Sequence, residues 1–303
     1  MQSLAFKYFY EVAQTGSLSA ASESLHVAIS AISRQISTLE QRLGTPLFER
    51  SARGMRLTEA GQLLLRHVRR SLLETEAAFE QIAALRGAER SPIRIACTQG
   101  LANELVPGAI AAFGRKHPRC RFRIWVDSAR GATERVAAGE ADMAVTFSTT
   151  PADHVQVRYA HSAAALAVMS QTHPLAERRR LSLKDLVDYP LALTDENTST
   201  YRLFQLASNM AGLNLQPRVF SNYAEALHAY VRDSQAVLFA SYVSISERLR
   251  PNRLVAIPLR NTEMHARTIQ VQVMSGRILP DMMEQFIEFM IRRVHEVSEA
   301  APR

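Results

Sequence analysis

Serine and arginine side chains repeat along one stripe of a short segment near the N-terminus. Ser30, Ser33, Arg34 and Ser37 fall on one helical face, away from the apolar residues of the same segment. Short hydroxyl side chains allow close approach to a DNA groove, and an arginine can donate two hydrogen bonds to O6 and N7 of guanine or bind phosphate. A serine-rich solvent face would give the same pattern, so the stripe alone leaves both interpretations open.

Three arginines follow this stripe in a stretch without acidic residues. Arg50, Arg53 and Arg56 belong to a segment that also contains Pro46 and Gly54, which is typical of a β-hairpin. Such a hairpin could serve as a wing that contacts the minor groove or the phosphate backbone. The helix and the basic wing together favour DNA binding more than either does alone.

Short helices must position these groups. Ser17 is a candidate N-cap for the second helix, and Gly44 ends the third as a C-terminal glycine would. Three short helices joined by tight turns predict a helix-turn-helix unit. The apolar positions that define the helices are Phe6, Phe9, Tyr10 and Ala13, then Ala21 and Leu25, then Ile32, Ile36, Leu39 and Leu43.

A long helix is predicted next, from Thr58 as N-cap to about Arg86. Its apolar seam has the three-four alternation of a coiled coil. A helix of this length between domains has little partner surface in its own chain, so we expect it to dimerise; packing against its own domain is the alternative. Residues 87–92, with Gly87 and Pro92 at the ends, predict a linker. The seam consists of Gly61, Leu65, Val68, Leu72, Thr75, Phe79 and Ile82.

Beyond Pro92, apolar strands alternate with helices, which predicts βαβ units and parallel sheets covered on both faces. We expect strands at residues 93–97, 121–126, 141–147, 163–169, 191–194, 219–220, 237–240, 254–259 and 268–274. Helices are expected up to Lys116 and at residues 133–138, 201–211, 223–231 and 281–297. Two such α/β lobes would place a ligand cleft at the carboxyl ends of the strands.

Hydroxyl and amide side chains follow several of these strands. At helix N-termini, beside backbone N–H groups, such side chains suit an anion. Arg202, one turn into its helix, could add a positive charge, and a small organic carboxylate is the leading expectation for the ligand. Helix capping is an equally good explanation for most of these positions. The candidate effector contacts are Thr98, Gln99, Phe147, Ser148, Thr194, Ser199, Arg202, Ser221 and Asn222.

The composition of the chain excludes several classes of protein. With 303 residues and 47% hydrophobic content, it predicts two or three globular domains of roughly 100 to 200 residues each. The longest apolar stretch, residues 163–169, is too short to cross a bilayer, and the N-terminus lacks the apolar core of a signal peptide, so we expect a cytoplasmic protein. The net charge of +7 suggests an anionic partner, but the basic excess is spread along the chain.

Motifs for catalysis or metal binding are not found in the sequence. The twelve glycines form no Gly-x-Gly and the nine histidines no His-Glu-x-x-His, so we expect no enzymatic activity, no metal and no cofactor. His161, His173 and His228 are interpreted as solvent-exposed or hydrogen-bonded residues. Cys97 and Cys120 would lie at opposite ends of neighbouring parallel strands, which argues against a disulfide switch.

The N-terminal motifs keep one order and spacing over some sixty residues. They resemble the signature of LysR-type transcriptional regulators. Weaker landmarks of the family's effector domain follow at residues 113–118, 139–142, 173–176 and 183–186, so the resemblance covers essentially the whole chain. The motifs are Ser17-Leu18-Ser19-Ala20-Ala21, Leu25, Ala31-Ile32-Ser33-Arg34-Gln35-Ile36, Leu39-Glu40, Leu43-Gly44, Leu47-Phe48-Glu49-Arg50 and Leu57-Thr58-Glu59-Ala60-Gly61.

This resemblance implies an α+β multidomain fold. A winged helix-turn-helix would occupy residues 1–57, a dimerising linker helix and hinge residues 58–91, and an effector domain similar to two-lobed periplasmic solute-binding proteins residues 92–303. Lobe I would hold residues 92–162 and 268–303 and lobe II residues 163–267, with hinges near residues 160–165 and 266–268.

The resemblance also implies a function and adds residues to both candidate sites. Family members are sequence-specific regulators that usually bind promoter DNA as homotetramers and respond to a small metabolite between the lobes. The resemblance adds Ser17 and Ser19 to the candidate DNA contacts, and it favours Thr98 and Gln99 among the effector contacts.

Two sites depart from the family's pattern. Ala28 and Ile29 stand where the family commonly has Ser or Thr and then Gln, so we expect Ser30 to cap the recognition helix and Ile29 to contact a thymine methyl or nothing specific. Ser234-Gln235-Ala236 and Ser241 stand where the family has Gly-x-Gly and then Pro. The alternative function, a two-lobed receptor or transport binding protein, predicts an export signal and no DNA-binding module, and neither expectation fits the sequence.

Overall fold

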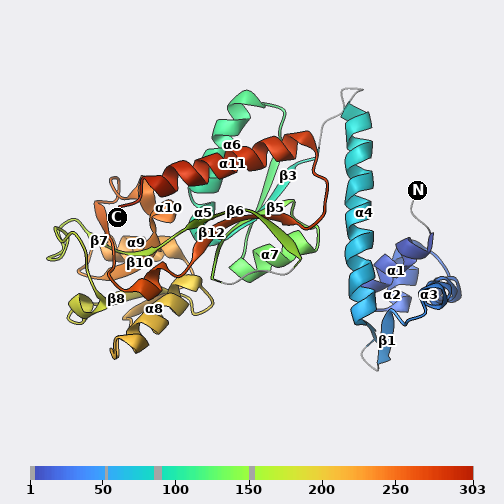
Figure 1. Cartoon of the computed structure of the whole chain (residues 1–303), viewed down its shortest axis with the longest axis horizontal. Helices are drawn as coiled ribbons and strands as arrows, with labels where there is room; N and C mark the ends of the chain where they lie inside the picture. The colour runs from blue at the N-terminus through green and yellow to red at the C-terminus, as the bar shows by residue number, and fades with distance from the viewer. Residues whose placement is uncertain (1–3, 52–53, 85–90, 150–153, 303) are drawn as a thin grey trace. The chain divides into compact units, whose positions relative to one another are not determined.

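The computed structural model describes residues 4–51, 54–84, 91–149 and 154–302, in two compact units (Figure 1). The first unit comprises Met1–Ala88 with Gly276–Ile278, and the second comprises Glu89–Ser275 with Leu279–Arg303. Within the described ranges, no helix combines the length and apolar character needed to span a membrane.

The first unit has the three short helices and the hairpin that the sequence predicts. Its core is formed by apolar side chains from all three helices and the hairpin, with Phe9, Ile32 and Leu47 fully buried. The elements are α1 (Leu4–Thr15), α2 (Leu18–Leu25), α3 (Ile29–Leu43), β1 (Phe48–Ser51), β2 (Gly54–Leu57) and α4 (Glu59–Ala84).

Two of the predicted helix boundaries are seen in the first unit. The Ser17 hydroxyl accepts a hydrogen bond from the backbone N–H of Ala20, and Gly44 ends α3 in the left-handed conformation, as predicted. The expectation that Ser30 caps α3 is wrong. The carbonyl of Ala28 already accepts hydrogen bonds from the amides of residues 31 and 32, so the helix starts at Ile29 and Ser30 lies inside its first turn.

The predicted seam of α4 divides into two parts. Leu65 and Val68 are buried in the core of the first unit, and Leu72 packs against that core. Phe79 and Ile82 remain 67% and 56% exposed. The N-terminal half of the seam therefore packs against its own domain, whereas the C-terminal half has two large apolar side chains that the described residues leave exposed.

Two five-stranded mixed sheets form the second unit, one in each lobe. The first sheet has the order β4-β3-β5-β12-β6 and the second the order β11-β7-β10-β8-β9. The first lobe contains β3 (Ile93–Cys97), α5 (Gln99–Ala102), α6 (Leu105–Lys116), β4 (Phe122–Val126), α7 (Ala129–Ala137), β5 (Met143–Ser148), β6 (Val155–Ser162), β12 (Thr268–Met274) and α11 (Asp281–Glu299).

The second lobe is built from the middle of the chain. Its elements are β7 (Ala165–Ser170), the 3₁₀ turn η1 (Leu183–Leu186), β8 (Leu191–Thr194), α8 (Ser199–Met210), β9 (Val219–Ser221), α9 (Ala224–Arg232), β10 (Val237–Ser241), α10 (Tyr242–Ile245), η2 (Ser246–Arg248), β11 (Leu254–Ile257) and η3 (Thr262–His265).

The expectation of purely parallel sheets is wrong. Strand β12 pairs antiparallel with β5 and β6, and β7 pairs antiparallel with β10 and β11. Parallel neighbours need a crossover connection, usually a helix, but β7 and β12 each enter their sheet directly from the other lobe. Strand β6 was not predicted, because this sheet-edge strand has one buried residue and no continuous apolar run.

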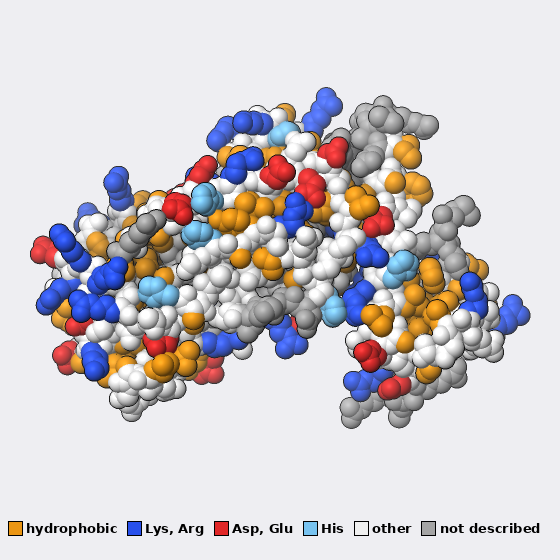
Figure 2. All heavy atoms as spheres, in the orientation of Figure 1, with side chains coloured by type: hydrophobic (Ala, Val, Ile, Leu, Met, Phe, Trp, Pro, Cys, Tyr) orange, Lys and Arg blue, Asp and Glu red, His pale blue; other side chains and the backbone are white. Residues whose placement is uncertain are grey.

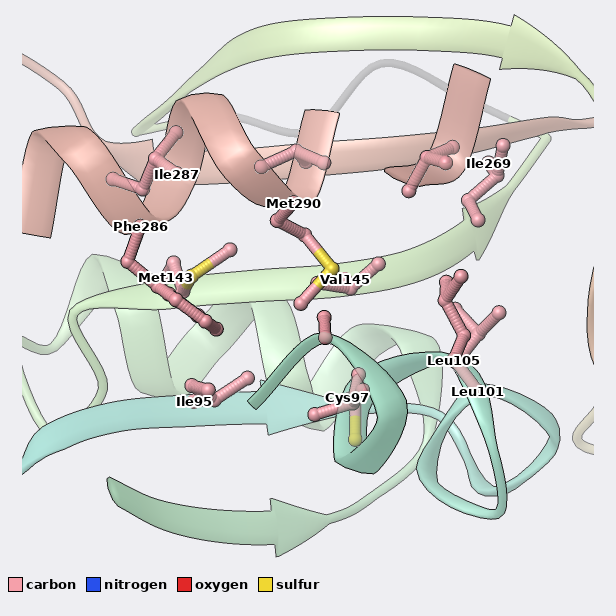
Figure 3. Close-up of a cluster of buried hydrophobic side chains, with 14 of the residues drawn as sticks. Ile95, Cys97, Leu101, Leu105, Met143, Val145, Ile269, Phe286, Ile287 and Met290 are labelled. Carbon is pink, nitrogen blue, oxygen red and sulfur yellow. The ribbon is translucent and has the colours of Figure 1, made fainter. Parts of the chain in front are cut away.

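The core of the first lobe lies between its sheet and the helices α6 and α11. Met143 and Val145 of β5 face Phe286 and Met290 of α11, with Ile95 of β3 beside them (Figure 3). In Figure 1, α11 runs along the sheet that contains β5 and β12. This packing fixes the strand ends from which the loops of the candidate site begin.

Two crossings connect the lobes, at the segments that the family resemblance marks as hinges. The amide of Ala163 donates to the carbonyl of Arg267 at 3.1 Å. Nε of the Arg267 guanidinium donates a second hydrogen bond, to the carbonyl of Ala163 at 2.8 Å. The two crossing segments are therefore tied directly to each other.

Candidate functional site

The predicted stripe of α3 is open to solvent. Ile29 is 45% exposed, Ser30 and Arg34 are exposed, and Ser33 and Ser37 are half-buried. The apolar residues on the other side of the helix are in the core. No described residue forms a hydrogen bond or ion pair with the Arg34 guanidinium, so its donors remain available to an external acceptor.

The wing is attached to α3 by a carboxylate. Oε1 of Glu40 accepts hydrogen bonds from the backbone amides of Leu47 and Phe48, at 2.8 and 3.3 Å. The hairpin then pairs Arg50 with Met55 and Glu49 with Arg56.

The wing arginines and the two serines of the second helix differ in exposure and in their hydrogen bonds. Arg56 is exposed, whereas Arg53 and the side chain of Arg50 lie outside the described part of the chain. Ser19 is exposed on α2, and Ser17 uses its hydroxyl as the cap of that helix. The DNA-facing role of these positions stays a prediction.

A cavity of about 330 Å³ lies between the two lobes of the second unit. It is near the lower end of the range for small-molecule sites, roughly 300 to 1,000 Å³. Its wall contains residues from both lobes and from the crossing at Arg267. Of the predicted effector contacts, Thr98, Gln99, Phe147, Thr194, Ser199 and Asn222 line this cavity.

Three predicted effector contacts lie outside the lining. Ser148 is paired opposite Thr268 in the sheet. Arg202 is exposed on α8 and donates to the carbonyl of Asn197 at 3.3 Å. The Ser221 hydroxyl accepts from the amide of Tyr223 at 3.0 Å, which is a local turn interaction.

Arg267 lines the cavity but was not among the contacts predicted from the sequence. It is 4% exposed, and its guanidinium carbon lies 4.5 Å from the centre of the Phe147 ring. Nη1 donates to the hydroxyls of Ser199 and Thr200, at 3.2 and 2.7 Å. Burial lowers the pKa of Arg267 to about 10, which still leaves the group charged at neutral pH.

Within the described ranges, no carboxylate pairs with Arg267. Asp127 also lines the cavity, but it accepts from Nε of Arg135 at 3.1 Å. Asp195 lies in the lining as an exposed residue, where water and salt screen its charge. The cavity wall thus carries a buried positive charge that has no carboxylate partner among the residues the structure describes.

Further hydrogen-bond donors line the same cavity. The Thr98 hydroxyl is buried and has no hydrogen-bond partner in the described part of the chain. Three helices, α7, α8 and α9, begin at the cavity, since their first residues line it: Ala129, Ser199 and Ala224. The positive N-terminal ends of three helix dipoles therefore lie at the cavity wall. Burial lowers the pKa of His228, another lining residue, and so favours the neutral form of its side chain.

Polar contacts join the lobes beside the cavity. Arg248 of η2 pairs with Glu104 from the first lobe and with Glu225 from the second. Asn103 donates to Oε1 of Glu225 at 2.8 Å, and the amide of Ala224 donates to the side-chain oxygen of Gln99 at 3.3 Å. These contacts form a small polar network that joins the lobes next to the lining residues.

The two cysteines and His173 lie outside the lining of this cavity. Cys97 is buried at the end of β3 (Figure 3), and burial raises the pKa of its thiol to about 12. Cys120 precedes β4, and the register pairs Cys97 with Val126 at the far end of that strand. Both cysteines are free thiols, as the predicted strand register requires. Nδ1 of His173 accepts from the amide of Leu175 at 3.1 Å.

Comparison with known protein families decides the classification. Residues 4–62 match the bacterial regulatory helix-turn-helix protein, lysR family, and residues 86–294 match the LysR substrate binding domain. The chain belongs to the LysR family of transcriptional regulators. It therefore combines a helix-turn-helix DNA-binding domain with an effector-binding domain, and the alternative of a receptor without gene regulation is not favoured.

Individual relatives agree with this family. A probable RuBisCO transcriptional regulator from Synechocystis sp. is 26% identical over 283 residues, covering 91% of this chain and 81% of the relative. The uncharacterized HTH-type transcriptional regulator YybE of Bacillus subtilis is 26% identical over 294 residues, covering 96% and 98%.

Solved structures share the fold of this LysR-family chain. A full-length OxyR variant from Pseudomonas aeruginosa has a TM-score of 0.65 at 19% identity and covers 100% of this chain and 97% of that one. CbnR complexed with its target DNA has a TM-score of 0.56 at 20% identity, covering 97% and 100%.

Proposed function

We propose that this regulator binds operator DNA through the α3 stripe and the wing, and that a small organic anion bound at Arg267 modulates this binding. The observation that carries the effector half of the proposal is the buried guanidinium in the cavity wall, without a carboxylate partner among the described residues. A regulator of this kind acts on DNA in the cytoplasm and needs no catalytic group.

The chemistry of the cavity favours an anion over a neutral ligand. A buried charge is unfavourable unless it is paired, and a bound carboxylate would supply the missing pair. The Thr98 hydroxyl and the N-termini of α7, α8 and α9 would add hydrogen-bond donors and positive dipole ends. Thr98 and Gln99 would act from the first lobe, and Thr194, Ser199 and Asn222 from the second.

The position of the cavity couples ligand binding to the arrangement of the lobes. Arg267 lies on a crossing between the lobes, and its guanidinium also binds the carbonyl of Ala163 on the other crossing. A ligand that prefers one lobe arrangement shifts the population toward it by its differential affinity. This shift would reach DNA binding through the assembly of the subunits.

The DNA half of the proposal rests on accessible side chains of the first unit. Arg34 and the serines of α3 would contact base edges or phosphates in the major groove. Arg50 and Arg53 of the wing would contact the backbone. The proposed DNA contacts are Ser17, Ser19, Ile29, Ser30, Ser33, Arg34, Ser37, Arg50 and Arg53.

Subunit pairing would use the C-terminal half of α4. Phe79 and Ile82 form an apolar face that the described residues leave exposed, and a second α4 offers the same face by symmetry. A homodimer through this linker helix, assembled further into a homotetramer, completes the proposal. The corresponding domains are residues 1–57, 58–91 and 92–303, with lobe II at residues 163–267.

A thermal-shift screen of the full-length protein tests the effector proposal. Small mono- and dicarboxylates, sulfate and phosphate are compared with neutral metabolites, because a ligand that binds the folded state raises its stability. We expect an anion to raise the melting temperature saturably in the wild type and in Arg34→Ala, but not in Arg267→Met. Stabilisation by neutral ligands alone, or an anion effect retained in Arg267→Met, would contradict the proposal.

A further inference from the structure

Two histidines and a glutamate meet on the first lobe, outside the effector cavity. His161 lies near the end of β6, and His295 and Glu299 are one turn apart on α11. One potential ligand atom from each residue lies within 4.8 Å of the other two. His161 Nε2 is 4.0 Å from Glu299 Oε1. Figure 2 shows histidine and acidic side chains gathered over the C-terminal part of α11.

A tyrosine hydroxyl orients both imidazoles. The Tyr159 oxygen lies 3.4 Å from Nδ1 of His161 and 3.1 Å from Nδ1 of His295. When this oxygen accepts from both Nδ1–H groups, the Nε2 atom of each ring is left with its lone pair, which is the form that binds a metal. A polar group that fixes the second ring nitrogen is a regular feature of histidine metal ligands.

We propose that His161, His295 and Glu299 form a binding site for a divalent transition-metal ion, with Zn²⁺ as the ion that suits them best. Two imidazoles and one carboxylate, with water in the fourth position, form a common zinc ligand set. Zinc bonds of roughly 2.0–2.2 Å place ligand atoms about 3.3 to 3.6 Å apart in a tetrahedron. His295 and Glu299 are exposed, so changes of side-chain rotamer can bring their ligand atoms to this spacing.

The cluster is distinctive within the molecule. Across the described ranges, it is the only group of three histidine, cysteine or acidic side chains with this mutual spacing. The sequence contains no motif of closely spaced metal ligands, so no metal site was predicted from it. The pair His295 and Glu299 has helical spacing, but the third ligand comes from a strand more than a hundred residues earlier.

The site would also have a structural consequence for the lobe crossing. His161 precedes Ala163 by two residues, and the carbonyl of Ala163 accepts the hydrogen bond from Arg267. His161 and Glu299 also line a second cavity, of about 370 Å³, together with Ser162 and His265. A bound ion would therefore fasten the end of β6 to α11 directly beside the crossing. The site itself does not depend on the effector proposal.

Isothermal titration of tag-free, chelator-treated full-length protein with Zn²⁺ tests the site. We expect one ion per chain in the wild type and, since losing even an outer-shell partner weakens metal sites about 10- to 100-fold, at least a 100-fold weaker affinity in His295→Ala and His161→Ala. Co²⁺ should give intense visible absorption in the wild type, as a four-coordinate ion does, and lose it in both variants.

Two further variants separate this site from general surface binding. His154→Asn removes an exposed histidine of the same lobe at a left-handed position that asparagine tolerates, and it should bind Zn²⁺ like the wild type. Tyr159→Phe should keep the stoichiometry but weaken binding about tenfold, because Tyr159 only orients the ligands. Equal affinity in the wild type and His295→Ala, or no wild-type binding below millimolar Zn²⁺, would overturn the proposal.

Discussion

Replacing Arg267 with methionine should abolish the anion response while leaving the stability of the ligand-free protein nearly unchanged. Methionine keeps much of the aliphatic length and removes the charge and the donors. The two effects are separable because Arg267 is buried without a carboxylate partner in the described part of the chain. If Arg267 instead served folding through a buried ion pair, its replacement would lower the stability of the ligand-free protein by several kcal/mol.

The expected magnitude follows from two opposing contributions. Burial lowers the pKa of Arg267 from 12.5 to about 10, which corresponds to about 3 kcal/mol against the charged form. Hydrogen bonds to Ala163, Ser199 and Thr200 offset this by about 1 kcal/mol each. The substitution should therefore change the free energy of unfolding by less than about 1 kcal/mol, whereas breaking a buried ion pair costs about 3–5 kcal/mol.

The assay is urea unfolding of the full-length protein, followed by the fluorescence of Trp125. This residue is the only tryptophan of the chain and lies in β4, so its signal reports the effector domain. The affinity for an anion found in the screen should fall at least about 30-fold, because losing a buried charged partner costs about 2 kcal/mol or more. A loss of several kcal/mol in the ligand-free variant would show that Arg267 has a hidden counter-ion and would refute the reasoning.

Three more predictions concern assembly, pH and thiol chemistry. Phe79→Glu should raise the monomer fraction in sedimentation, whereas Leu63→Glu, an exposed position on another side of α4, should not; equal behaviour would count against pairing through α4. Burial lowers the pKa values of His173 and His228, so stability should be full above the ordinary histidine value and fall as the pH drops through the lowered values. Urea midpoints at pH 7.5 and 5.5 measure this, and no decrease would contradict it. A thiol reagent should modify Cys120 in the native protein but spare Cys97, and rapid labelling of both, read by mass spectrometry, would argue against the buried thiol.

The elements of the first unit could be predicted from the sequence because their signals are local. Helical spacing, Ser17 and Thr58 as caps and Gly44 as a terminator mark the boundaries within a few residues. Gly61 is an exception, since it weakens the seam of α4 for a reason visible only in three dimensions. A Cβ at this position would overlap the carbonyl oxygen of Leu47, so a side chain is excluded where α4 meets the wing.

The effector cavity could be predicted only in part. Thr98, Phe147 and Thr194 lie at or just after the carboxyl ends of strands. Ligands of α/β sheets bind at these ends, so the three residues could be predicted from the strand positions. Arg267 has no such signal, because it lies on a crossing whose pairing with residue 163 joins segments about a hundred positions apart. The antiparallel direction of β7 and β12 was missed for the same reason: sequence spacing does not show that a strand enters from the other lobe.

Selection of binding sites from random DNA, with the full-length wild type and with Arg34→Ala, tests the central claim most directly. The wild type should enrich a defined motif with two related half-sites, because paired subunits present two α3 stripes. Arg34→Ala should lose base preference within each half-site and keep salt-dependent, non-specific affinity. A wild type that enriches no motif, or a variant with an unchanged motif, would contradict DNA recognition by this face of α3.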